Sequence, residues 1–115
     1  MIRADDRDLS LLHDMVSSAR LVGEFTADTN RTAFADDRMT VSAVEWQMIV
    51  MGRAAGAVSG TTRARLPELG WTAMAGFADR LVRRYRDVKP DEVWTAASES
   101  ASTVVRVLDP ALLPE

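Results

Sequence analysis

The sequence has no cysteine, one histidine, one tyrosine and one lysine. Without cysteine there is no disulfide, no thiolate metal site and no thiol nucleophile. A lone histidine makes a zinc site improbable, so no metal or other cofactor is expected. No apolar run approaches the ~18 residues of a membrane helix, and the N-terminal segment lacks an apolar signal core. We therefore expect a cytoplasmic protein that does not contact membranes.

Other common catalytic patterns are also missing. The six glycines are scattered and form no glycine-rich phosphate loop. His13 lies beside the apolar positions of its segment, and no nucleophile–base set accompanies it. Acidic pairs such as Asp91/Glu92 begin predicted helices, where they suit the helix N-terminus. Helix capping explains these pairs better than two-carboxylate catalysis does.

Apolar residues recur every three or four positions over four long segments, which predicts four amphipathic helices. The expected helices span residues 6–25, 40–59, 71–87 and 90–109. A polar loop with room for one short turn of helix joins the first two, and a connector containing Pro67 joins the next two. The sequence predicts an all-α protein, a small up-and-down bundle of four to five helices, with residues 1–115 as a single domain.

The second long segment, residues 40–59, is apolar on two sides. One side carries a seam of residues spaced by three and four, and the opposite side carries Trp46, Ile49 and Val50. Such a helix either lies at the centre of the bundle or is covered by a partner chain. The second interpretation predicts a homodimer interface at Trp46, Ile49, Val50 and Arg53.

A basic segment interrupts a chain whose net charge is only −3. Residues 78–89 contain four arginines and one lysine against two acids, which gives this segment a charge of +3. The segment can attract phosphate, although the whole chain is too acidic for a dedicated sequence-independent DNA binder. A solvated helix face explains the same residues, because Asp79 and Arg83 form a favourable i,i+4 pair.

Short motifs follow one another in a characteristic order. Ala-Arg-Leu-x-x-Glu-Phe occurs at residues 19–25, and Val-Glu with Gly-x-Ala-Ala at residues 44–55. A Pro-x-x-x-Trp connector occupies residues 67–71, residues 76–85 follow Gly-x-Arg-Asn-x-Leu-Val-His-x-Tyr in part, and Val-Trp stands at 93–94. Over nearly the whole chain this order resembles the HepT-like toxin family, a branch of the HEPN group of helical RNases.

The resemblance implies a metal-independent RNase that works in a cleft between two protomers. It also implies that the arginine of the long motif steadies phosphate and that the histidine assists proton transfer. Ala78 and Arg83 occupy those two positions here, Asp79 replaces the asparagine, and Arg53 stands where an acid is usual. An arginine does not exchange a proton near pH 7, because its pKa exceeds ~12. No catalytic residue is therefore intact, while Arg80, Arg83 and Arg84 remain candidates for RNA phosphate contacts.

The resemblance further implies a toxin–antitoxin module with an MntA-like nucleotidyltransferase as antitoxin. Tyr85 matches the family tyrosine that this partner modifies with AMP. An ordinary structural interpretation is that Tyr85 ends the apolar stripe of Met74, Phe77 and Leu81 as a core residue. Three functions remain open: a weak RNase toxin, a non-catalytic relative that binds RNA or its partner, and a non-enzymatic helical homodimerisation module. The missing histidine favours the second.

Overall fold

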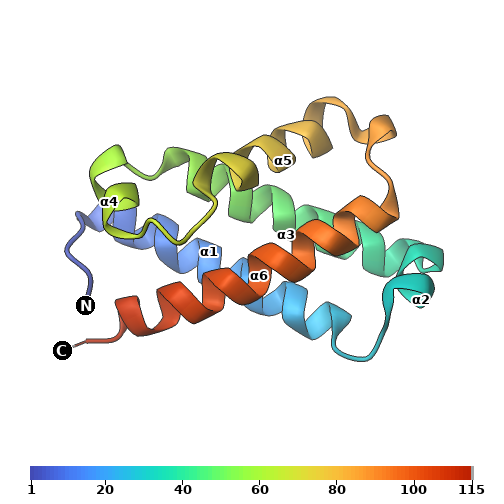
Figure 1. The fold of residues 1–115 in the computed structure, drawn as a ribbon, viewed down its shortest axis with the longest axis horizontal. Helices are drawn as coiled ribbons and strands as arrows, with labels where there is room; N and C mark the ends of the chain where they lie inside the picture. The colour runs from blue at the N-terminus through green and yellow to red at the C-terminus, as the bar shows by residue number, and fades with distance from the viewer. Residues whose placement is uncertain (115) are drawn as a thin grey trace.

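In the computed structural model, residues 1–114 are described, and this part of the chain contains helices and no β-strand. Four long helices run alternately up and down, with shorter ones in the connections (Figure 1). The elements are α1 (Asp6–Thr26), α2 (Arg31–Asp36), α3 (Arg38–Ala57), α4 (Gly60–Arg65), α5 (Trp71–Arg83), the 3-10 helix η1 (Tyr85–Asp87) and α6 (Pro90–Leu112). The predicted all-α, up-and-down bundle is therefore confirmed. Among the described helices, none is long and apolar enough to cross a bilayer.

The helix α3 lies at the centre of the bundle. It packs against α1 on one side and α5 on the other, while α6 packs mainly against α1 (Figure 1). The seam residues Val44, Met48, Met51 and Ala55 are almost completely buried. The interpretation of this segment as a central helix is therefore confirmed, although Trp46 keeps 60% of its surface exposed.

Small residues allow α3 and α5 to pack closely. A Cβ atom added to Gly52 would lie 2.4 Å from the Cβ of Ala78 and 2.4 Å from the carbonyl oxygen of Met74. Real side-chain atoms do not approach this closely, so the contact requires glycine at position 52. This packing fixes the orientation of α5 and therefore of the motif between Gly76 and Tyr85.

The helix α4 lies inside the segment that we expected to be an irregular connector. Its N-cap residue is Ser59, whose backbone N–H and hydroxyl both donate to the buried carboxylate of Asp8, at 3.1 and 2.5 Å. The Thr62 hydroxyl donates to the same carboxylate at 2.6 Å. Because Asp8 belongs to α1, local sequence patterns around residues 60–70 do not contain this stabilising contact.

Two expected helix ends also differ from the structure. The helix α5 ends at Arg83, because the backbone of Arg84 leaves the helical region and η1 replaces the last turn. Pro90 requires an extended residue before it, so the chain turns before α6 begins. The helix α6 continues past Pro110 to Leu112, since a proline in the last turn removes only one backbone hydrogen bond.

Candidate functional site

The two positions at which the resemblance predicts a catalytic pair, Ala78 and Arg83, lie in different environments. Ala78 is completely buried against α3, whereas the side chain of Arg83 is 72% exposed. A methyl group in the core reaches no ligand, and a guanidinium on the surface does not transfer protons near neutral pH. The chain therefore presents no general acid or base at either position.

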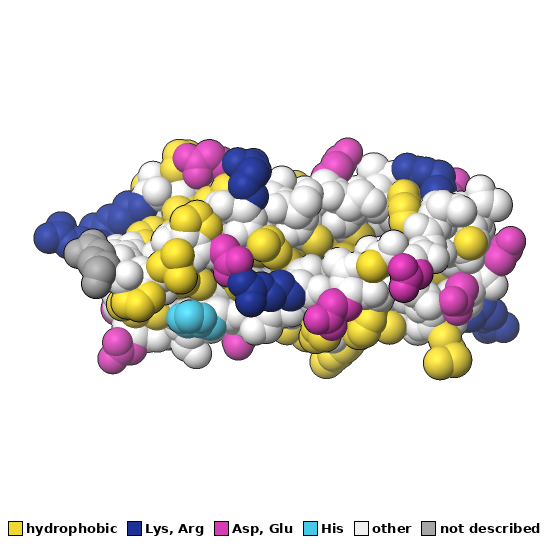
Figure 2. All heavy atoms as spheres, turned by 90° about the horizontal axis from the view of Figure 1, so that it is seen from below, with side chains coloured by type: hydrophobic (Ala, Val, Ile, Leu, Met, Phe, Trp, Pro, Cys, Tyr) yellow, Lys and Arg dark blue, Asp and Glu magenta, His cyan; other side chains and the backbone are white. Residues whose placement is uncertain are grey.

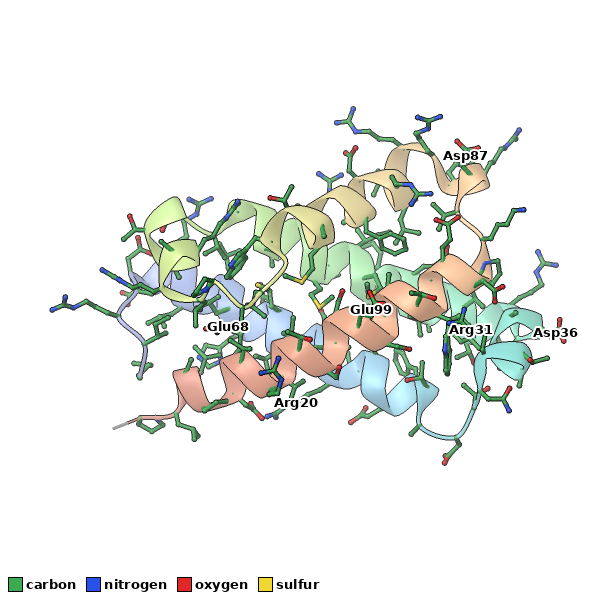
Figure 3. The ribbon with its side chains drawn as sticks, in the orientation of Figure 1. Arg20, Arg31, Asp36, Glu68, Asp87 and Glu99 are labelled. Atoms are coloured by element: carbon green, nitrogen blue, oxygen red, sulfur yellow. The ribbon has the colours of Figure 1, made fainter. Side chains whose placement is uncertain are left out.

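The three arginines predicted to contact phosphate are all paired with acids. The pairs are Arg80–Glu92 at 2.9 Å, Arg83–Asp79 at 2.7 Å and Arg84–Asp87 at 3.1 Å. Figure 3 shows Asp87 at the corner between α5 and α6, with arginine side chains projecting around it into solvent. Exposed pairs of this kind contribute about 0–1 kcal/mol each, so a phosphate can displace the carboxylate at small cost.

Arg80 differs in direction from the other two arginines. It lies near the Phe77 ring, with 6.0 Å between the guanidinium carbon and the ring centroid, and donates to Glu92 at the start of α6. This hydrogen bond holds the pKa of the Glu92 carboxyl below its usual value. Arg31 also contacts α6, because its guanidinium donates to the Thr95 hydroxyl at 3.0 Å (Figure 3). Arg80 is therefore directed toward α6 rather than toward α3.

A shallow groove runs between α3 and α5, and we call it the α3–α5 groove. Its volume is about 330 Å³ and its lining residues are Gly52, Arg53, Gly56, Ala57, Ala75 and Asp79. Within residues 1–114, Arg53 forms no ion pair. Asp79, which also lines the groove, accepts a hydrogen bond from Arg83. Arg53 of α3 therefore lines the groove directly, and Arg83 of α5 is joined to it through Asp79, which the linear motif did not predict.

Tyr85 lies in η1 and is 61% exposed. The interpretation of this tyrosine as a core residue is wrong, because α5 ends two residues earlier and its helical periodicity stops with it. Met74 and Leu81 are buried as the stripe predicted, and Phe77 is partly buried against the core. The phenol of Tyr85 is accessible from solvent.

The predicted dimer residues lie along the outer side of α3. Trp46 and Arg53 are exposed, while Ile49 is partly buried against the core and Val50 is half-buried. The face therefore combines one large exposed aromatic ring with two partly covered aliphatic side chains.

Within the described residues, no group of three or more histidine, cysteine, aspartate or glutamate side chains could hold a metal ion. The only histidine, His13, is exposed on α1, and it is the cyan side chain in Figure 2. On the face in that view, acidic and basic side chains alternate and form no patch of one sign. The ionisable side chains of α3, α5 and η1 are arginines, carboxylates and the accessible phenol of Tyr85.

Comparison with known proteins identifies a family and related sequences. The family described as "Ribonuclease HepT-like" matches residues 15–110. A Methanocaldococcus jannaschii protein that is provisionally named an RNase is 24% identical over 87% of this chain and 92% of its own length. A Thermococcus cleftensis protein named "Probable ribonuclease HepT" is 27% identical over 76% of this chain and 80% of its own. No solved structure matches significantly. The chain belongs to the HepT-like ribonuclease family.

Proposed function

We propose that this protein is a single-domain, cytoplasmic toxin component that binds RNA through the α3–α5 groove and cleaves it weakly or not at all. The proposal rests on the residues at positions 78 and 83, where the resemblance predicts an arginine and a histidine. Ala78 is buried in the core and Arg83 is an exposed guanidinium, so neither transfers a proton. Loss of a general acid or base typically lowers a rate about a hundred- to ten-thousand-fold.

Arg53 and Arg83 support RNA binding in this groove. Arg53 is exposed and forms no ion pair with any described residue, and the ion pair of Arg83 with Asp79 is exposed to solvent, where phosphate can replace the carboxylate. Guanidinium groups bind phosphate through paired N–H donors. Where the family resemblance predicts an arginine at position 78, this chain has a buried alanine, and Arg53 of α3 is the exposed guanidinium that lines the groove.

The partners of this function follow from the family resemblance and from two exposed side chains. We infer a homodimer formed through Trp46, Ile49, Val50 and Arg53 of α3, and a nucleotidyltransferase antitoxin as the second partner. The exposure of Trp46 supports the homodimer, because a large aromatic ring in water is typical of an interface. The exposure of Tyr85 supports modification by the antitoxin, because a transferase needs access to the phenol.

A second candidate is a non-enzymatic homodimerisation module. It is favoured by the ion pairs of Arg80, Arg83 and Arg84, which a purely solvated helix face also explains. In that case the exposed face of α3 would be the functional surface, and the protein would have no affinity for RNA.

Binding and cleavage of labelled single-stranded RNA distinguish these functions. We expect salt-sensitive retention of RNA with no cleavage above the protein-free blank. Arg53→Ala and Arg83→Ala should each weaken retention and reduce its salt dependence. Arg106→Ala is the matched control, because Arg106 is exposed on α6 and forms no ion pair among the described residues. Rapid cleavage by the unaltered chain would contradict the loss of activity, and absence of retention would favour the dimerisation module.

A further inference from the structure

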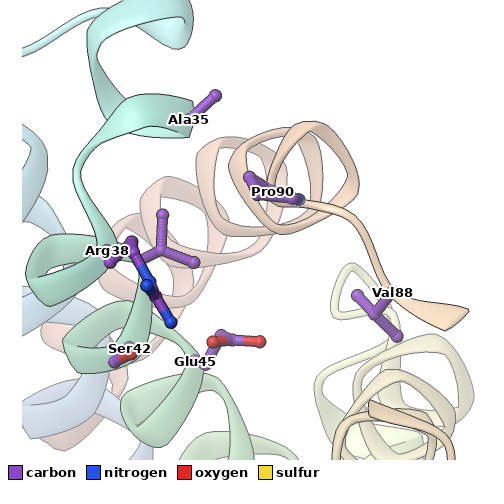
Figure 4. Close-up of a pocket in the computed structure, with 7 residues that line it drawn as sticks. Ala35, Arg38, Ser42, Glu45, Val88 and Pro90 are labelled. Atoms are coloured by element: carbon purple, nitrogen blue, oxygen red, sulfur yellow. The ribbon is translucent and has the colours of Figure 1, made fainter. Parts of the chain in front are cut away.

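A second cavity lies further along α3, and we call it the α2–α3 pocket. Its volume is about 220 Å³, and it is lined by Ala35, Arg38, Val41, Ser42, Glu45, Val88 and Pro90. Figure 4 shows Arg38, Ser42 and Glu45 along one wall, with Val88 and Pro90 on the segment that faces them. Sites for drug-sized ligands usually measure ~300–1,000 Å³. This pocket therefore suits a smaller group, such as one flat ring system.

The charged groups of the pocket have no ion-pair partner in the part of the chain that the structure describes. Within residues 1–114, Arg38 and Glu45 form no ion pair, either with each other or with another residue. They lie seven residues apart on one side of α3, a separation of about 10.5 Å along the axis, with Ser42 between them. The guanidinium and the carboxylate are thus available to a ligand that lies between them.

A ligand that donates hydrogen bonds would stabilise the charged carboxylate of Glu45. Burial raises the pKa of its carboxyl above the ordinary value, and no hydrogen bond from the described residues offsets this effect. A partly desolvated carboxylate gains most from a ligand that supplies two N–H donors. The apolar surfaces of Val41, Val88 and Pro90 complete a site for a flat group with a polar edge.

We propose that the α2–α3 pocket binds a guanine base, with Glu45 accepting from its N1–H and N2–H groups and Arg38 donating to its O6 and N7 atoms. Guanine is the common base that presents two adjacent N–H donors on its Watson–Crick edge. Its other polar edge carries two acceptors, which are the preferred partners of an arginine fork. On their Watson–Crick edges, adenine, cytosine and uracil each offer the carboxylate a single donor group. They therefore match Glu45 and Arg38 less well than guanine does.

This inference rests on the proposed function, because the guanine would belong to RNA whose phosphates contact the α3–α5 groove. Glu45 and Arg53 are eight residues apart, or about 12 Å along α3, and a few nucleotides span that distance. Single-stranded RNA exposes its bases for this kind of recognition. The two sites together predict a preference for guanine at one position of the bound strand.

The test measures affinity for two kinds of probe. One is the set of four nucleoside 5′-monophosphates, and the other is an oligoadenylate with or without one central guanine. We expect guanosine monophosphate and the guanine-containing strand to bind about tenfold or more tightly than their counterparts. Glu45→Gln and Arg38→Ala should each remove this preference. Glu24→Gln and Arg106→Ala are matched exposed controls, and circular dichroism of all four variants verifies that they fold.

The outcomes separate this inference from the proposed function. Equal binding of both strands would overturn guanine recognition and leave RNA binding in the α3–α5 groove intact. Binding of guanosine monophosphate without binding of either strand would overturn RNA as the source of the base, together with the proposed function. Binding of none of the probes would overturn both. A guanine preference that survives Glu45→Gln and Arg38→Ala would place the base at another site and overturn this one.

Discussion

Gly52 of α3 and Ala78 of α5 lie against each other so closely that neither position has room for a larger side chain. A Cβ at Gly52 would come within 2.4 Å of the Cβ of Ala78, and Ala78 itself is fully buried. Arg53 follows Gly52 in the sequence, and position 78 is where the family resemblance predicts an arginine. The close packing therefore occurs at the same crossing of two helices as both of these positions.

Substituting Gly52 should destabilise the fold. We expect Gly52→Ala to lower the free energy of unfolding by about 1–3 kcal/mol, because the added methyl group overlaps α5 backbone and side-chain atoms. Urea denaturation followed by circular dichroism measures the change. Gly23→Ala in α1 is the control, because nothing lies within 4 Å of its new Cβ. That variant should gain about 0.5–1 kcal/mol from the higher helix propensity of alanine. Equal stability of the two variants would contradict the close approach.

Asp8 should make stability depend on pH in the acidic range. Hydrogen bonds from the Ser59 and Thr62 side chains hold the pKa of Asp8 below its usual value of 3.8, and the charge of Arg7 adds a smaller effect in the same direction. A carboxyl group with a lowered folded-state pKa stabilises the fold above its unfolded pKa of ~3.9. This contribution is lost as the pH falls below that value and through the folded-state pKa.

We expect Asp8→Asn and Asp14→Asn to differ in how much they change the free energy of unfolding. At pH 7, Asp8→Asn should lower the free energy of unfolding by about 2–3 kcal/mol, because a buried charged acceptor of hydroxyl groups is replaced by a neutral amide. The difference from the natural chain should shrink as the pH is lowered below 4. Asp14→Asn, an exposed residue of the same helix, should change stability little at either pH. A constant Asp8→Asn effect from pH 7 to pH 3 would contradict the role of the carboxylate.

The long helices could be predicted because the apolar spacing that specifies each helix lies within its own segment of the sequence. Apolar spacing located α1, α3, α5 and α6 to within a few residues, and Pro90 marked the start of the last helix. The helix α4 could not be predicted, because its start is held by Asp8, 51 residues earlier in the chain. Tyr85 was misassigned because its apparent place in a stripe assumed that α5 continued beyond Arg83.

The sequence predicted which residues contribute to the candidate site, but not how they lie relative to one another. The sequence identified Arg80, Arg83 and Arg84, yet the pairing of Arg80 with Glu92 depends on how the chain turns between two helices. The sequence did not predict that Arg38 and Glu45 line one pocket, because the Val88–Pro90 corner that completes it comes from a distant segment. Sequence periodicity specifies which side of a helix is buried, but only packing specifies which exposed residues meet.

The exposed side of α3 should control self-association. If Trp46 lies in a homodimer interface, Trp46→Glu should reduce the mass measured by light scattering at micromolar concentration from that of a dimer to that of a monomer. Leu113→Glu is the control, because Leu113 is similarly exposed, at 63%, but lies beyond the end of α6. A monomeric natural chain at this concentration would contradict the homodimer, as would a Trp46→Glu variant that remains dimeric.

Restoring a proton-transfer group should restore cleavage only at position 83. Ala78→Arg would force a guanidinium into the α3–α5 contact, so we expect misfolding rather than activity from the variant that rebuilds both motif positions. Arg83→His instead places an imidazole on an exposed helix face, one turn from Asp79, which lines the groove together with Arg53. Cleavage of labelled RNA should rise about a hundredfold or more over the natural chain, with a pH dependence centred near ~6.5.

Adding Arg53→Ala to Arg83→His should abolish the gained activity, whereas adding Arg106→Ala should not. A folded Arg83→His variant that remains inactive would show that Arg53 does not replace the family arginine at the reaction centre. In that case the groove would retain its arginines for binding alone, because a proton-transfer group without a phosphate-stabilising neighbour leaves the charge of the transition state uncompensated.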